Sequence, residues 1–115
     1  MVWVRPVGID YVKKPNERCL HGLHFDYFLV EPTAPEELAL HFQGAFGENV
    51  FRLEERLGPR PVIRLVLKFV MELRIGESNN QFALIHRMSA NQERREETER
   101  LVEETLKELA GNKRE

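Results

Sequence analysis

The chain has 115 residues, of which 42% are hydrophobic and 31% charged, and its formal net charge is −2. This length suits one domain with a real core, and the single cysteine, Cys19, excludes a disulfide within the chain. A slightly acidic protein is not a general nucleic-acid coat, since such proteins are normally basic. No apolar run approaches the roughly 18 residues of a membrane span, so no membrane association is expected. The N-terminus also lacks the pattern of a secretion signal, and we therefore expect a cytoplasmic protein.

Two strands are predicted in the N-terminal third of the chain. The first covers residues 2–12 and is interrupted by a proline and a glycine, which is typical of an edge or bulged strand. A polar loop is expected over residues 13–23. The second strand, 24–30, has aromatic side chains on both faces, a pattern that favours a central position in a sheet.

A helix is predicted after the second strand. Thr33 and Glu36 have the spacing of a capping box, and Gly47 is placed to end the helix in a left-handed turn. Apolar residues between them recur at helical spacing and would face the sheet. A third strand is expected over residues 49–57.

Residues 62–75 have the strongest pattern in the chain, because every odd position from Ile63 to Ile75 is apolar. This alternation predicts one long strand with a core face and a charged face. The alternative is a buried helix, in which Arg64, Lys68 and Glu72 would share one stripe. A straight strand of this length would measure about 46 Å, so it must bend, contain a bulge or pair beyond the domain. Residues 76–80 are expected to form a hairpin loop that leads to a partner strand at 81–88.

The last predicted element is a helix over residues 90–110, with Ser89 and Gln92 as a second capping box and Gly111 after its end. Its first half has no apolar side chain, which is typical of a solvated helix or of an arm that docks a partner. The apolar stripe of its second half is our candidate interface for packing or self-association: Leu101, Val102, Leu106 and Leu109.

These elements predict an α+β fold, with a mostly antiparallel sheet, one packed helix and a long C-terminal helix. The chain is treated as one domain over residues 1–115. The sheet and first helix occupy 1–89, the C-terminal helix 90–111 and a short tail 112–115.

Candidate chemistry is sparse. The densest group of metal-binding residue types is Cys19, His21 and His24, to which His41 could add a fourth ligand; four such side chains suit zinc. Their spacing is not one of the common zinc signatures, and a loop cysteine with turn histidines is the alternative. Asp26 within the aromatic strand could act as an acid or base if buried, and the alternative is a sheet-edge aspartate that is satisfied by the backbone or by an arginine. No nucleophile elbow or phosphate loop is present in the sequence, so no catalytic residue is assigned.

The middle of the chain is richer in basic residues than either end. Arg52, Arg64 and Lys68 are candidate contacts to nucleic acid or another anion. A solvated sheet face is the alternative. Nearby aromatic side chains could stack on bases if they were exposed, as in single-strand binders.

The segments Asp26-Tyr27-Phe28-Leu29-Val30 and Phe46-Gly47-Glu48, followed by Leu53, resemble the start of a group of phage-encoded proteins that are similar to recombination directionality factors. The resemblance covers residues 5–57 and departs at Asn49-Val50, where the group usually has Lys-Pro. It implies an accessory protein of a mobile element that binds another protein, on or off DNA, and catalyses nothing.

The sequence therefore predicts a non-enzymatic protein-binding or regulatory module that forms a homodimer. A small zinc-binding domain or metal-dependent enzyme is the second hypothesis. Nucleic-acid binding through the basic sheet face is the third.

Overall fold

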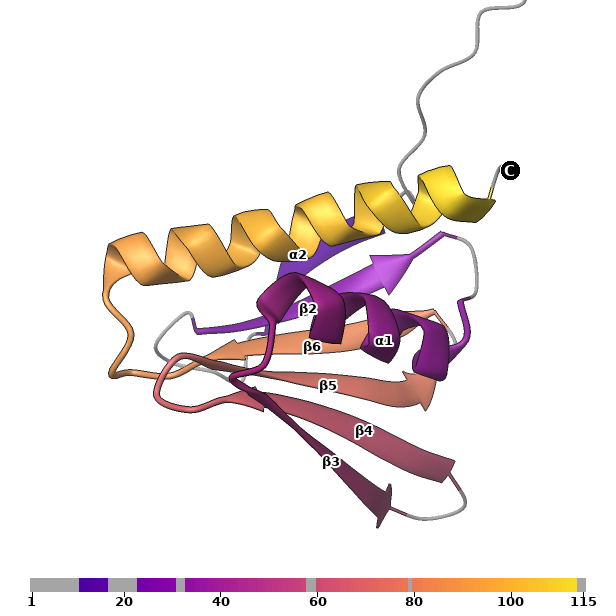
Figure 1. Cartoon of the computed structure of the whole chain (residues 1–115), viewed down its shortest axis with the longest axis horizontal. Coiled ribbons are helices and arrows are strands. Elements are labelled where there is room, and N and C mark those ends of the chain that lie inside the picture. Colours follow the sequence, from indigo (N-terminus) through magenta and orange to yellow (C-terminus); the bar gives the residue numbers. More distant parts are fainter. Residues whose placement is uncertain (1–10, 17–22, 31–32, 58–59, 79, 114–115) are drawn as a thin grey trace, which may run out of the picture.

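The computed structural model describes residues 11–16, 23–30, 33–57, 60–78 and 80–113 (Figure 1). In this part of the chain, six strands form one antiparallel sheet and two helices pack on it, which confirms the predicted α+β fold. The elements in chain order are β1 (Tyr11–Pro15), β2 (His24–Leu29), α1 (Pro35–Phe46), β3 (Val50–Leu57), β4 (Arg60–Leu67), β5 (Met71–Ser78), β6 (Gln81–His86) and α2 (Gln92–Lys113).

The strands lie in the order β1-β2-β6-β5-β4-β3. After β2, α1 carries the chain to the far edge, and β3 to β6 then return strand by strand until β6 lies beside β2. The predicted central position of β2 is confirmed. The predicted polar loop over 13–23 is wrong at its start, because Lys13 to Pro15 belong to β1 and pair with β2. Most of the first predicted strand lies outside the described residues.

The core is a single cluster on one face of the sheet, and both helices cover that face (Figure 1). The stacked rings of Tyr27 and Phe82, with centroids 4.8 Å apart, lie near its centre, and Phe42 of α1 meets Phe82 edge-on at 5.2 Å. From α2 come Val102, Leu106 and Leu109, all fully buried. Burial of this much apolar area on one face is the main stabilising contribution to the fold.

The prediction of one long strand over 62–75 is wrong. The segment is a hairpin of β4 and β5, in which Leu67 pairs with Met71 and Val66 with Glu72. The turn between them has no glycine, proline, asparagine or aspartate; Phe69 at its centre adopts a positive φ of 67° and is 67% exposed. Because three residues separate the paired positions 67 and 71, odd-numbered residues face the core in both strands, and the alternation continues through the turn.

Both predicted capping boxes are absent. The N-cap of α1 is Ala34, one residue after Thr33, with Pro35 at the first helical position. The amide of Arg94 donates to the Asn91 side chain at 2.8 Å, so Asn91 caps α2, while Ser89 donates to the Phe69 carbonyl at 2.6 Å. α1 ends at Gly47 as predicted, since Gly47 has φ 82° and its amide donates to the Gln43 carbonyl. The predicted left-handed turn is wrong, because the ψ of Gly47 is −163°, outside the left-handed helical region. α2 continues past its predicted end to Lys113.

Neither helix has an apolar stretch long enough to cross a membrane, within the part of the chain that the structure describes.

Candidate functional site

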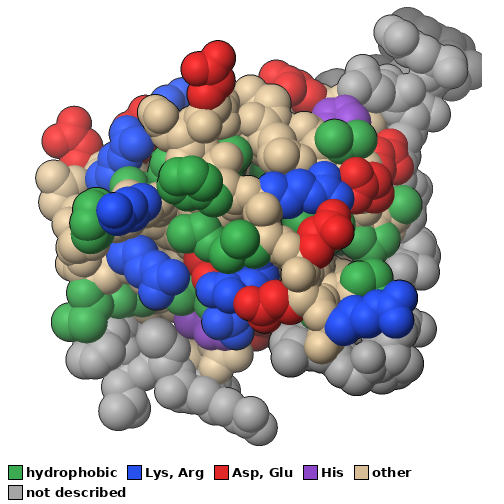
Figure 2. Space-filling view, turned by 60° about the horizontal axis from the view of Figure 1, so that its bottom comes forward, with side chains coloured by type: hydrophobic (Ala, Val, Ile, Leu, Met, Phe, Trp, Pro, Cys, Tyr) green, Lys and Arg blue, Asp and Glu red, His purple; other side chains and the backbone are tan. Residues whose placement is uncertain are grey.

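The face of the sheet opposite the helices, here called the open face, carries the most distinctive group of side chains. None of the described helices lies on it, and Figure 2 views the molecule from this side. Hydrophobic side chains lie there among Lys, Arg and a few acidic groups (Figure 2). The strand registers assign these residues to the open face: Phe51, Leu53 and Glu55 of β3; Val62, Arg64 and Val66 of β4; Glu72 and Arg74 of β5; Ala83 and Ile85 of β6; and His24, Asp26 and Phe28 of β2.

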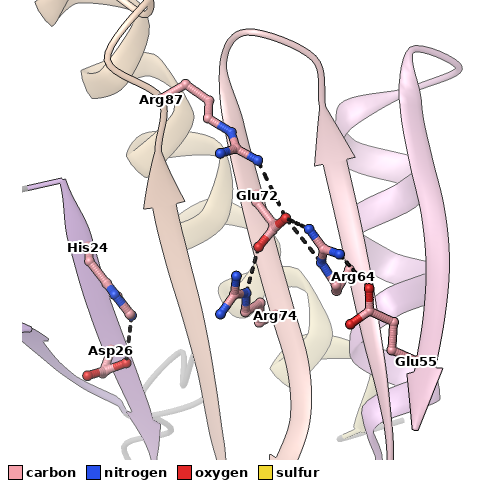
Figure 3. Close-up of polar contacts among 7 residues, drawn as sticks. All are labelled: His24, Asp26, Glu55, Arg64, Glu72, Arg74 and Arg87. Carbon is pink, nitrogen blue, oxygen red and sulfur yellow. Dashed lines mark hydrogen bonds and ion pairs between the residues drawn. The ribbon is translucent and has the colours of Figure 1, made fainter. Parts of the chain in front are cut away.

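At the centre of the open face, a buried carboxylate is held by three arginines (Figure 3). Glu72 is 1% exposed. Arg64 donates to Glu72 Oε1 through Nη2 and, at 3.1 Å, through Nε, and Arg74 Nε donates to Oε2 at 2.6 Å. Arg87 Nη2 lies 3.6 Å from Glu72 Oε1, and Arg64 also donates to Glu55 at 2.5 Å. We call Glu55, Arg64, Glu72, Arg74 and Arg87 the arginine cluster.

Burial of Glu72 would by itself raise the pKa of its carboxyl. The hydrogen bonds from Arg64 and Arg74 outweigh that effect, and the pKa of Glu72 is lowered from its usual value. Glu72 therefore stays ionised at neutral pH and fixes the arginines in place. The side chains of Arg74 and Arg87 remain 47% and 46% exposed, so part of their positive charge is available to a partner.

Apolar side chains flank the arginine cluster. Phe51 on β3 is 60% exposed and lies opposite Val66 in the register, and Leu53 is 46% exposed. Val66 in turn pairs with Glu72, and Glu72 with Ile85. One row across the sheet thus places aromatic, aliphatic and charged groups side by side, as in the core of a protein interface.

Of the three predicted anion contacts, the structure places only Arg64 on the open face. Arg52 lies on the helix side of β3, where it donates to Glu36, Glu54 and Gln43, so its charge is already balanced. Lys68 lies in the turn between β4 and β5, with its amine 5.1 Å from the Phe69 ring centroid. Sequence reasoning missed Arg87 and the grouping of Arg74 with Glu72, because that grouping depends on the β4–β5 register.

The structure does not bring together His24 and His41, two of the candidate zinc ligands. His24 lies on the open face, with Nε2 3.3 Å from Asp26 Oδ1, while His41 is on α1 and its Nδ1 lies 2.9 Å from the Glu37 carbonyl oxygen. Cys19 and His21 lie outside the described residues. Among the residues that are described, no group of three or more His, Cys, Asp or Glu side chains could hold a metal ion.

Asp26 lies on the open face, where its carboxylate contacts two polar side chains. Asn16 Nδ2 donates to its Oδ2 at 3.2 Å, and His24 lies against Oδ1. His86 is in the core, beneath α2, with Nε2 3.4 Å from Glu99 Oε2. Burial lowers the pKa of His86, and the Glu99 carboxylate offsets part of that effect.

The predicted interface residues of α2 lie in two environments. Val102, Leu106 and Leu109 are fully buried in the core of a single chain, where they pack on the sheet. Leu101 lines a groove of about 540 Å³ between α1 and α2, together with Leu40, His41, Gly44, Ala45, Glu104, Thr105 and Glu108. Three of the four residues are therefore inaccessible to a second copy while the chain is folded.

No protein-family model, curated protein or solved structure matches this chain at a significant level.

Proposed function

We propose that this protein is a non-enzymatic binding module that docks an acidic protein partner on the open face of its sheet. The observation that carries the proposal is the arginine cluster, in which a buried, ionised Glu72 holds arginines that remain half-exposed beside apolar side chains. A carboxylate of the partner would bind Arg74 and Arg87, and an apolar side chain would cover Phe51 and Val66. Arginines that are already fixed lose less side-chain entropy on binding.

The charge of the open face favours a protein over a nucleic acid. Its arginines are partly neutralised by Glu55 and Glu72, and the whole chain has a net charge of −2. A nucleic-acid site would carry a larger positive excess, since affinity there comes mainly from contacts to phosphates. An accessory role in a mobile element, as the resemblance of residues 5–57 implies, fits the same proposal, because such a role is also performed through protein contacts.

The test compares three forms of the protein as bait in cell extracts: wild type, an open-face variant (Arg74→Ala with Arg87→Ala) and a control variant on α2 (Arg94→Ala with Arg100→Ala). The control arginines are also exposed, with side chains 49% and 62% accessible. We expect one protein to be retained by wild type and by the control and lost from the open-face variant. The same dependence must then appear in a titration with that purified protein.

Each bait must also be titrated with fluorescent single-stranded and double-stranded oligonucleotides. Binding that falls steeply with salt and is lost in the open-face variant would replace the proposed protein partner with a nucleic acid. Retention of the same proteins by wild type and the open-face variant would contradict the proposal.

A further inference from the structure

β3 is an end strand of the sheet, and in the described part of the chain it pairs only with β4. It has eight residues and no proline. An end strand presents a row of unpaired backbone N–H and C=O groups, which can pair with another strand. Its exposed Phe51 and Leu53 provide apolar area beside that row.

We propose that β3 pairs antiparallel with β3 of a second copy, about a two-fold axis at Leu53, so that the two sheets become continuous. Such an axis is perpendicular to the sheet, and each open face continues into the open face of the other copy. Residues opposite one another then lie on the same face, and the residue at the axis faces itself.

Charge complementarity selects Leu53 as the centre. In this register Arg52 of each copy lies opposite Glu54 of the other, and Leu53 lies opposite Leu53. Moving the centre to Arg52 would place two arginines opposite one another. Moving it to Glu54 would place two glutamates opposite one another and Arg52 opposite Arg56. Like charges in directly opposite positions are destabilising.

The side chains on both faces of β3 suit this register. On the helix side, Glu54 is 63% exposed and already accepts from Arg52 of its own chain at 2.8 Å, and a carboxylate can accept from a second arginine. Arg52, which is paired within its own chain, would then share its ion pairs with Glu54 of the second copy. On the open face, Phe51 would lie diagonal to Leu53 of the second copy, within the reach of an aromatic ring. The pairing would cover part of the surface of Phe51 and Leu53, which are otherwise exposed, and this partial burial would favour the dimer.

The first experiment is disulfide trapping in a Cys19→Ser background. Leu53→Cys would place two thiols opposite one another, with Cβ atoms about 4.5 Å apart if the pair is a non-hydrogen-bonded one. A disulfide can bridge that distance, and we expect a covalent dimer under mild oxidation. Phe51→Cys is the matched control on the same strand and face. Its two thiols would be offset by four residues, about 13 Å along the strand, so no covalent dimer is expected from this variant. Equal trapping at both positions, or none at residue 53, would overturn the register.

The second experiment reverses the charges. Arg52→Glu alone, or Glu54→Arg alone, places like charges opposite one another and should weaken dimerisation in sedimentation experiments by about tenfold or more. The double variant Arg52→Glu with Glu54→Arg should recover most of the wild-type dimer. A double variant as weak as the single ones, or single variants that dimerise like wild type, would contradict the proposal. The open-face variant Arg74→Ala with Arg87→Ala should keep the wild-type mass, which separates this inference from the proposed partner site.

Discussion

Glu72 holds the arginines of the open face in place and contributes to the stability of the fold. A carboxylate that is 1% exposed would be strongly unfavourable without partners, and here both of its oxygens accept hydrogen bonds from arginines. Since the pKa of Glu72 is lower in the folded state, the group binds fewer protons when the chain is folded. Its contribution to stability is present at neutral pH and is lost as the pH falls through the lowered pKa.

We predict that Glu72→Gln lowers the free energy of unfolding by about 2 kcal/mol at neutral pH, because the arginines lose their buried counter-charge. The difference from wild type should shrink in acid, at a pH below the lowered pKa of Glu72, where the wild-type carboxyl also becomes protonated. Urea unfolding at the two pH values measures both quantities. Glu97→Gln is the control, since Glu97 is 46% exposed and forms only a surface ion pair with Arg94. A constant difference at both pH values would show that the carboxylate charge is not responsible.

At the residue level, the sequence indicated Arg64 as a basic group on a charged sheet face, and the structure agrees. The sequence alone could not indicate that Arg74 and Arg87 share the carboxylate of Glu72 with Arg64. Arg74 reaches Glu72 along β5, Arg64 reaches it across the β4–β5 register, and Arg87 follows β6. The arginine cluster is therefore a property of strand pairing, which composition and spacing do not contain.

Among the elements, the β4–β5 hairpin shows why periodicity alone missed a turn. A loop of two or four residues would have shifted the phase of the alternation, whereas the three-residue loop of Lys68, Phe69 and Val70 preserves it. The residue types also gave no turn signal, since Phe69 adopts a conformation that usually favours glycine or asparagine. Only the excessive length of the predicted strand indicated a break.

Position 76 on β5 requires glycine because of its backbone conformation and the close approach of β4. It has φ +118°, and a Cβ at this position would lie 2.7 Å from the Pro61 carbonyl oxygen on β4. We predict that Gly76→Ala lowers the free energy of unfolding by about 2 kcal/mol or more, through backbone strain and displacement of β4.

Gly44 on α1 is the matched control, because a Cβ there would have no heavy atom within 4 Å. Gly44→Ala should raise stability by about 0.5–1 kcal/mol, since alanine is the better helix former. Thermal unfolding of the two variants measures the contrast. Equal effects would mean that the close approach to Pro61 is not what requires glycine at position 76.

The N-terminal cap of α2 gives a second prediction about a single element. Asn91→Ala removes the side-chain acceptor for the Arg94 amide and should cost about 1 kcal/mol. Urea unfolding would detect this loss. Ser89→Ala should cost less, because Ser89 lies outside the helix and is exposed. A larger effect at Ser89 would mean that its hydrogen bond to the Phe69 carbonyl contributes more to stability than the Asn91 cap.

At the scale of the whole molecule, α2 closes one side of the only core cluster in the described part of the chain. We predict that Leu106→Asp abolishes cooperative unfolding, because it places a carboxylate in the centre of that core. Leu101→Asp should leave a folded protein, since Leu101 is partly exposed in the groove between the helices. Circular dichroism during heating distinguishes the two outcomes. A folded Leu106→Asp variant would show that α2 is dispensable for the core.

The overall architecture was predictable because amphipathic patterns determine which face of each element is buried. Alternating residues in β4, β5 and β6 and the stripes of α1 and α2 all point to one core, and the structure has that core. The order of strands and the precise starts of the helices were less predictable. They depend on pairing between distant segments, and on competing caps only one or two residues apart.

The two edges of the sheet are unlike, and this difference limits how large an assembly can become. In the described part of the chain, β1 has five residues and ends at Pro15, which has no N–H to donate, whereas β3 has eight residues and no proline. If β3 of one copy pairs with β3 of another, neither β3 has an unpaired edge left. The joined sheet then has a β1 strand at each end. Assembly through β3 alone would then stop at a closed pair instead of growing into a fibre, because each copy has one β3 edge and the pair uses both.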